Sequence, residues 1–192
     1  MNERISKTRR KLKKYLDQDR YEHTLGVMFT AASLAMRYGE NVEEAMMAGL
    51  LHDCAKCIPS GKKLKLCDKY HLNITKSEYQ NPSLLHAKLG AFLAAKKYHI
   101  TNQRILDAIA CHTTGKPEMT LLDKIIYIAD FMEPGRCEAP NLPKVRKLAF
   151  INIDECLFRI LEDSLAYLHT RDLVIDDMTE KTYLYYKELL NK

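Results

Sequence analysis

The chain has 192 residues, of which 46% are hydrophobic and 29% charged, and its formal net charge is +5 at pH 7. This length and balance predict one globular domain with a substantial core and exclude a second domain of full size. The charge is too mild to indicate a nucleic-acid partner, because Lys and Arg cluster only at 9–14, where a basic amphipathic helix usually presents a solvated face.

The sequence shows no signal for export or membrane insertion. Its N-terminal MNERISKTRRKLKKYL lacks the apolar segment of a signal peptide, and no stretch approaches the roughly 18 apolar residues of a membrane span. We therefore expect a cytoplasmic protein with no membrane partner. The six cysteines are then expected to be free thiols, and the CxxC at Cys54 and Cys57 has no second pair with which to form a zinc site.

The apolar pattern predicts helices along almost the whole chain. Gly39 is expected to end a helix over 22–38. The inward stripe of that helix is expected to consist of Leu25, Met28, Ala32, Ala35 and Met36. Asn41 is expected to cap the next helix, with Glu44 in a capping-box arrangement, and this helix runs toward His52.

Further helices follow a break at 59–61. The expected elements are a short polar helix, a loop near Asn81, and helices over 84–98, 103–111, 121–132, 144–169 and 180–190. Thr101 is expected to cap the helix over 103–111, and Thr120 with Asp123 the helix over 121–132. Together these elements predict an all-α helical bundle.

Polar residues of the metal-ligand type interrupt several of the apolar runs. His52 and Asp53 end AMMAGLLHD, His112 ends AIACH, Asp130 ends KIIYIAD, and His86 lies inside LLHAKLGAFLAA. An ionised carboxylate in such an apolar setting needs a compensating charge or a metal. Four histidines, including His23, and two aspartates form a mixed N/O set that suits iron, manganese or zinc better than calcium. Two metals that share a carboxylate would leave coordination positions for water and substrate.

These residues resemble the H…HD…H…H…D pattern of the HD superfamily, in the order His23, His52, Asp53, His86, His112 and Asp130. More narrowly, RYEH, LLHDCAK and CHTTGKPEMTLLDKIIYIADFMEPGR resemble the YqeK family, over about residues 12–190. The resemblance implies a single HD domain over 1–192. Its metal-binding core is expected over about 20–136, with C-terminal helices over about 144–190 completing the bundle and the nucleotide pocket.

The resemblance also implies a symmetrically cleaving dinucleoside tetraphosphatase, which converts diadenosine tetraphosphate and water into two ADP. It places one metal among His23, His52, Asp53 and Asp130, and a second at His86 and His112, with Asp53 bridging the two. Iron is the favoured metal, with manganese and zinc as alternatives, and the two ions would activate a hydroxide as the nucleophile. The expected catalytic residues are Asp53, Lys56, Asp130 and Arg136.

Phosphoryl transfer needs positioned positive charge, for which Lys56 and Arg136 are the candidates, although such side chains at helix ends often only bind backbone carbonyls. The expected substrate-binding residues are Arg20, Glu22, Lys56, Thr113, Thr114, Arg136, Val174, Ile175 and Asp176. The partner is then a small nucleotide, with a dinucleoside polyphosphate as substrate and ADP or GDP as product. The sequence leaves a homodimer open.

Three other functions compete with this interpretation. A nucleotidase or triphosphohydrolase acting on mononucleotides would use the same chemistry. A non-catalytic nucleotide-binding regulatory module could keep the ligands for stability alone. A basic RNA-binding module is the most distant alternative, and it would bind RNA with a steep salt dependence.

Overall fold

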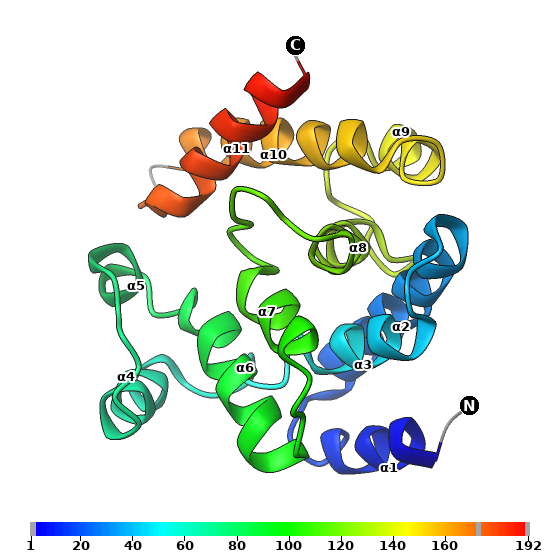
Figure 1. Cartoon of the computed structure of the whole chain (residues 1–192). Helices are drawn as coiled ribbons and strands as arrows, with labels where there is room; N and C mark the ends of the chain where they lie inside the picture. Colours follow the sequence, from blue (N-terminus) through cyan, green and yellow to red (C-terminus); the bar gives the residue numbers. More distant parts are fainter. Residues whose placement is uncertain (1–2, 172–173, 191–192) are drawn as a thin grey trace.

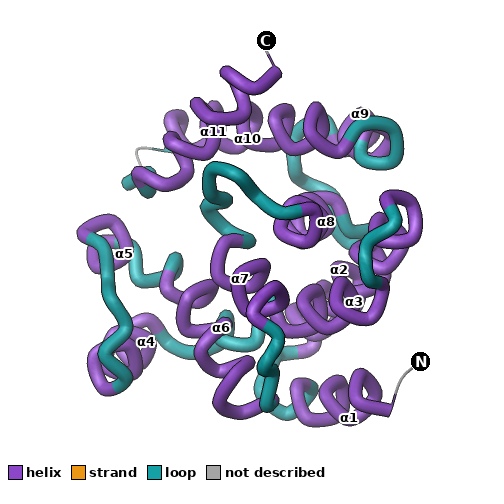
Figure 2. Tube along the Cα trace, viewed as in Figure 1, coloured by secondary structure: helices purple, strands orange, loops and turns teal. Residues whose placement is uncertain are grey.

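The computed structural model describes residues 3–171 and 174–190 (Figure 1). These residues form eleven helices and no strand, so the all-α class is confirmed (Figure 2). The helices are α1 (Glu3–Leu12), α2 (Gln18–Tyr38), α3 (Val42–Leu51), α4 (Ser60–Lys69), α5 (Lys76–Gln80), α6 (Leu85–Tyr98), α7 (Gln103–Cys111), α8 (Leu121–Met132), α9 (Leu142–Leu148), α10 (Ile153–Thr170) and α11 (Asp177–Leu190).

Helix α8 lies at the centre of the bundle. It packs against α2, α3 and α7 on one side and against α9 and α10 on the other (Figure 1). Its apolar residues Ile125, Ile126 and Ile128 are fully buried, which explains why KIIYIAD is apolar around most of the helix. Helix α11 packs on α10, while α4 packs on α6 at the periphery. Asp130, in the last turn of α8, therefore lies close to the middle of the molecule.

Most of the expected helix ends are confirmed. Gly39 ends α2 with a φ of 72°, in the left-handed region that favours glycine. The side chain of Asn41 caps α3, and Thr120 with Asp123 forms a complete capping box on α8. Glu44 does not complete the box on α3, because its carboxylate pairs with Arg104 at 2.9 Å.

Three further local expectations were wrong. Asn102, not Thr101, caps α7, because its side chain accepts from the backbone N–H of Arg104. Met36 is 67% exposed, so the buried stripe of α2 ends at Ala35. The single helix expected over 144–169 is two helices, since Asn152 leaves the helical conformation and its side chain caps α10.

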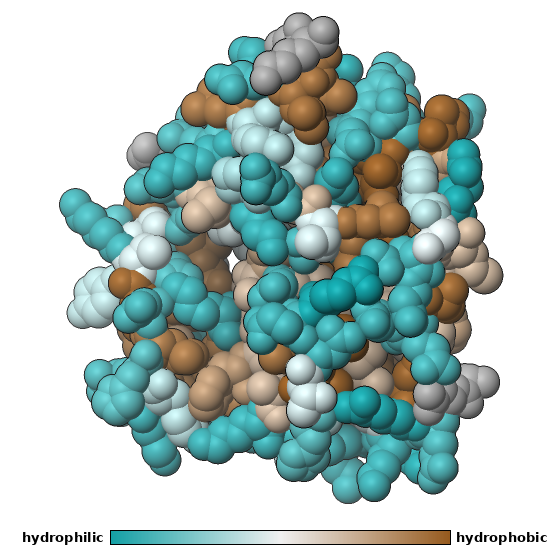
Figure 3. Space-filling view, in the orientation of Figure 1, coloured by the Kyte–Doolittle hydropathy of each residue, from teal (hydrophilic) through white to brown (hydrophobic). Residues whose placement is uncertain are grey.

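Among the described helices, none combines the length and the apolar character that crossing a membrane requires. The face shown in Figure 3 is mostly hydrophilic, with apolar residues scattered over it. It is hollowed below the C-terminal helices, on the side that faces α5 and α6.

Candidate metal centre

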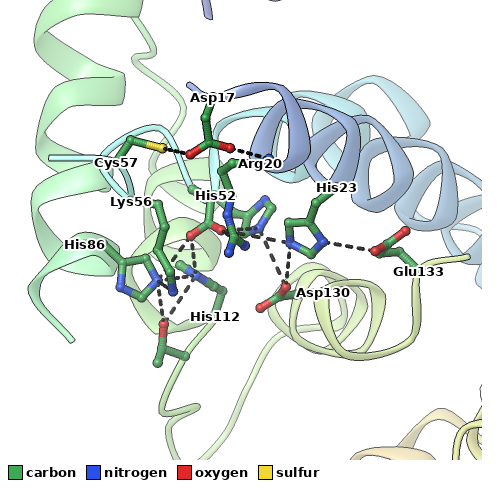
Figure 4. Close-up of polar contacts among 12 residues, drawn as sticks. Asp17, Arg20, His23, His52, Lys56, Cys57, His86, His112, Asp130 and Glu133 are labelled. Carbon is green, nitrogen blue, oxygen red and sulfur yellow. Dashed lines mark hydrogen bonds and ion pairs between the residues drawn. The ribbon is translucent and has the colours of Figure 1, made fainter. Parts of the chain in front are cut away.

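All six predicted ligands meet at one place, where several helix ends converge (Figure 4). His23 comes from α2, Asp130 from α8, and His86 from the first turn of α6. His52 and His112 are the residues that cap the C-termini of α3 and α7, and Asp53 follows His52 directly. Five helices thus bring together residues separated by more than 100 positions in the sequence.

The first group of ligand atoms surrounds Asp130. His23 Nε2 lies 3.0 Å from Asp130 Oδ1, and His52 Nε2 lies 3.7 Å from the same oxygen. Asp53 Oδ2 is 3.5 Å from His52 Nε2 and 3.9 Å from His23 Nε2. The atoms of His23, His52 and Asp130 lie close enough together to hold one metal ion.

The second group uses the other oxygen of Asp53. Asp53 Oδ1 lies 3.2 Å from His86 Nε2 and 3.7 Å from His112 Nε2, and these two nitrogens are 3.1 Å apart. Asp53 therefore turns one oxygen to each group, which is the arrangement of a carboxylate that bridges two metals.

The imidazoles are oriented by hydrogen bonds on the opposite side of each ring. The Nδ1 atoms of His52 and His112 both lie 2.7 Å from a backbone carbonyl three residues earlier in the chain. His86 Nδ1 lies 2.5 Å from the carbonyl of Ser83. Because a carbonyl can only accept, each Nδ1 carries the proton, and Nε2 presents a lone pair to the centre of the site. Such outer contacts are typical of metal-binding histidines.

Several inward-facing atoms lack a partner of their own within the protein. His23 Nε2, His52 Nε2 and Asp53 Oδ1 are buried without a hydrogen bond of acceptable geometry. His86 Nε2 and His112 Nε2 lie 3.1 Å apart and point into the same site. Buried acceptors that converge in this way fit a divalent metal, and the donor set is that of transition metals.

The protonation states suit metal binding. Burial raises the pKa of Asp53, but the neighbouring imidazoles, His52 foremost, outweigh burial and hold the pKa well below its ordinary value. Burial has the same effect on Asp130, and there His23 and His52 keep the pKa low. Burial lowers the pKa of His86 to about 4, so this imidazole is neutral near pH 7. Both carboxylates are therefore ionised, and the His86 lone pair is available.

Three cationic side chains surround the ligands. Arg20 Nη1 lies 2.8 Å from Asp53 Oδ2, and Arg136 Nη2 lies 2.9 Å from Asp130 Oδ1. Lys56 Nζ lies 3.3 Å from His86 Nε2. The side chains of Arg20 and Arg136 are 28% and 40% exposed, and Arg136 also lines the neighbouring cavity. The structure thus places all three predicted cations at the centre.

The other predicted residues lie at different distances from the ligands. Thr113 Oγ1 is 3.3 Å from both His86 Nε2 and His112 Nε2. The hydroxyl of Thr114 donates to the Gly115 carbonyl, which is a contact of the turn that ends α7. Glu22 is exposed on α2 and accepts a hydrogen bond from Gln18 at 2.6 Å, away from the ligand atoms.

A cavity of about 800 Å³ opens next to the ligands. Its inner end is formed by His112, Thr113, Asp130 and Arg136. Its lining also includes Tyr127, Phe131, Tyr167, Val174, Ile175 and Asp176. Asp176 also accepts hydrogen bonds from Ser77 Oγ at 2.5 Å and from the backbone N–H of Met178, so its carboxylate joins α5 to the start of α11. The size and mixed lining of the cavity are typical of small-molecule sites.

Sequence analysis missed Glu133, which is buried beside His23. Its Oε1 lies 3.1 Å from His23 Nδ1, on the side of the ring that faces away from the ligand centre. It also missed the aromatic walls of the cavity. The available signal was an acidic residue three positions after Asp130, at the end of an apolar helix.

Comparisons with known proteins agree with this geometry. Residues 20–135 match the family model described as HD domain. The symmetrical bis(5'-nucleosyl)-tetraphosphatase of Bacillus subtilis is 36% identical, over 90% of this chain and 91% of the relative. The protein of the same name from Staphylococcus aureus is 32% identical, over 95% of this chain and 94% of the relative.

A solved structure is also similar. It is a crystal structure from Clostridium acetobutylicum, described as a predicted HD superfamily hydrolase involved in NAD metabolism. The two structures match with a TM-score of 0.92 and 36% sequence identity, and the match covers 96% of this chain and 97% of the other. The likeness therefore extends through the C-terminal helices and is not confined to the metal-binding core.

Proposed function

Because this chain belongs to the HD-domain family and, within it, to the family of symmetrical bis(5'-nucleosyl)-tetraphosphatases, we propose that it hydrolyses dinucleoside tetraphosphates symmetrically. The reaction converts diadenosine tetraphosphate and water into two ADP. The observation that carries the proposal is the position of Asp53, whose two oxygens face two separate groups of histidines.

The ligands divide between two ions in this proposal. His23, His52, Asp53 and Asp130 would hold the first, and Asp53, His86 and His112 the second. Divalent ions bound there would polarise phosphoryl oxygens and lower the pKa of water into the neutral range. We propose iron as the metal, with manganese and zinc as alternatives, since the mixed N/O donor set accommodates all three.

The side chains around the ligands would bind the phosphates. Arg136 lies at the inner end of the cavity, and its guanidinium can neutralise charge on a phosphate that reaches Asp130. Arg20 supplies positive charge beside Asp53, and Lys56 supplies it beside His86. The Thr113 hydroxyl can donate to a phosphoryl oxygen. These groups stabilise charge that develops during phosphoryl transfer, which is the main task of such a site.

The cavity would hold a nucleoside of the substrate. In its lining, Phe131 and Tyr167 provide aromatic surface, and Val174 and Ile175 provide apolar surface. Its walls come both from the 20–136 core and from α10 and the segment at 174–176. We therefore propose one functional domain over 1–192, in which the C-terminal helices complete the nucleotide pocket.

Product analysis tests the proposal. Protein loaded with Fe²⁺ under anaerobic conditions, and in parallel with Mn²⁺, is incubated with diadenosine tetraphosphate, and the products are separated by ion-exchange chromatography. ADP as the sole product supports symmetrical cleavage, whereas ATP with AMP would contradict it. Faster hydrolysis of mononucleotides would support a nucleotidase instead. Nucleotide binding without any turnover would support the non-catalytic regulatory module.

A further inference from the structure

His23 differs from the other three histidines in how its ring is oriented. His52 and His112 cap helix C-termini, so each Nδ1 can donate to one of the last carbonyls of its own helix, which lack intrahelical partners. His86 likewise uses Ser83, just before α6. His23 lies inside α2, where the backbone carbonyls already accept hydrogen bonds within the helix. It therefore needs an acceptor from elsewhere in the fold.

Glu133 provides that acceptor. Its carboxylate is buried, with Oε1 3.1 Å from His23 Nδ1 and Oε2 accepting the backbone N–H of Gly135 at 2.6 Å (Figure 4). A carboxylate can only accept, so His23 Nδ1 carries the proton and Nε2 presents its lone pair toward Asp130. We propose that Glu133 is a positioning residue, which orients His23 and increases its basicity as a ligand of the first metal ion. This inference rests on the two-metal site of the proposed function.

Gly26 makes room for the carboxylate. It lies three residues after His23, on the same face of α2. A Cβ atom at this position would lie 2.3 Å from Glu133 Oε2 and 3.0 Å from its carboxyl carbon. Any side chain at residue 26 would therefore displace the carboxylate. A helix-interior glycine is otherwise unfavourable by about 1 kcal/mol relative to alanine, so its presence here agrees with a requirement for space.

Arg146 supports the backbone on the other side of Glu133. Its guanidinium donates to the carbonyls of Met132, Glu133 and Arg136, each at 2.9 Å. These bonds hold the turn after α8 against α9. Arg146 lies beyond residues 20–135, which match the HD-domain model, so part of the support for the first metal comes from outside that region.

Manganese titration by calorimetry tests the inference without relying on catalysis. Wild-type protein is compared with Glu133→Gln and Gly26→Ala, with Mn²⁺ as the only ligand. In Glu133→Gln the amide NH₂ would face either His23 Nδ1–H or the Gly135 N–H, because the side chain keeps only one acceptor oxygen. In Gly26→Ala the added methyl group displaces the carboxylate, while alanine favours the helix.

Two matched variants serve as controls. Glu188→Gln removes an exposed carboxylate on α11, and Gly61→Ala adds a methyl group where no atom lies within 4 Å. We expect both test variants to weaken one Mn²⁺ binding step by about 10–100-fold, the usual effect of losing an outer partner of a metal-binding histidine. The other step and the thermal midpoint of Gly26→Ala should match those of the controls.

The outcomes separate the inference from the proposed function. Wild-type-like Mn²⁺ binding in both test variants, or equal weakening of both steps, would overturn the role of Glu133. If Glu133→Gln fails to fold, the Gly26→Ala titration decides. Wild-type protein that binds two Mn²⁺ but leaves diadenosine tetraphosphate intact would contradict the proposed function, while the titrations would still test the positioning of His23.

Discussion

Asp53 and His86 face each other across the candidate metal centre, with Asp53 Oδ1 3.2 Å from His86 Nε2. The second oxygen of Asp53 points to the other ligand group and to Arg20. A single buried carboxylate thereby connects all four histidines.

Asp53→Asn should abolish the two-metal centre. The amide removes a negative charge and offers only one acceptor oxygen to two ligand groups. Turnover of diadenosine tetraphosphate should fall by about 10³-fold or more, because Lewis-acid stabilisation of several kcal/mol is lost. Metal content, measured by mass spectrometry after desalting, should fall below one ion per chain. Full metal content in the variant would contradict the bridging role.

His86→Ala should remove only the second ion. His23, His52 and Asp130 form the first group without it, so about one metal per chain should remain while activity is lost. His169→Ala, at an exposed position in α10, is the matched control and should leave both quantities unchanged. Activity close to that of the control would favour the view that these ligands serve stability alone.

Arg136→Ala should impair phosphate binding but not metal binding. Loss of one charged group that stabilises the transition state typically costs about 10²–10³-fold in rate. We therefore expect kcat/KM to fall by about that factor at unchanged metal content, and Arg136→Lys to restore only part of it because lysine lacks the planar fork. Arg159→Ala, at an exposed pair with Glu162, is the control. An unchanged kcat/KM in Arg136→Ala would mean that this arginine only donates hydrogen bonds to Asp130, near the end of α8.

ADP should protect Cys137 from thiol reagents. Cys137 is exposed and lines the cavity, whereas Cys57 is exposed elsewhere. Burial raises the pKa of Cys54 and of Cys156 to about 12, so these thiols stay protonated and unreactive at pH 8. We expect two thiols per native chain to react quickly and all six after unfolding. ADP should slow modification at Cys137 and not at Cys57, as followed by peptide mass spectrometry. Equal rates at Cys137 with and without ADP would place the nucleotide elsewhere.

The metal ligands could be predicted from the sequence because they are polar residues at positions where the helical pattern predicts apolar ones. His52, Asp53 and His112 end apolar runs whose other members are mostly buried, which points to a buried polar site. The family resemblance then assigned roles to them. The geometry of Asp53, with one oxygen for each histidine group, agrees with the bridging role that the resemblance implied.

Other features depended on contacts that no local pattern indicates. Glu133 follows an apolar helix and precedes Pro134, where an acidic residue usually faces solvent, and its role comes only from its proximity to His23. The break before α10 was missed because apolar residues continue through Phe150 and Ile151, while Asn152 caps the next helix. Thr101 and Asn102 are both good capping residues, and the sequence could not decide between them.

Anomalous diffraction from crystals grown with Fe²⁺ or Mn²⁺ tests the two-metal centre most directly. We expect two anomalous peaks about 3.5–4 Å apart with Asp53 between them. One peak should contact His23, His52 and Asp130, and the other His86 and His112. Crystals supplied with either metal that show no peak among these side chains, or only a single peak that Asp53 does not contact, would contradict it.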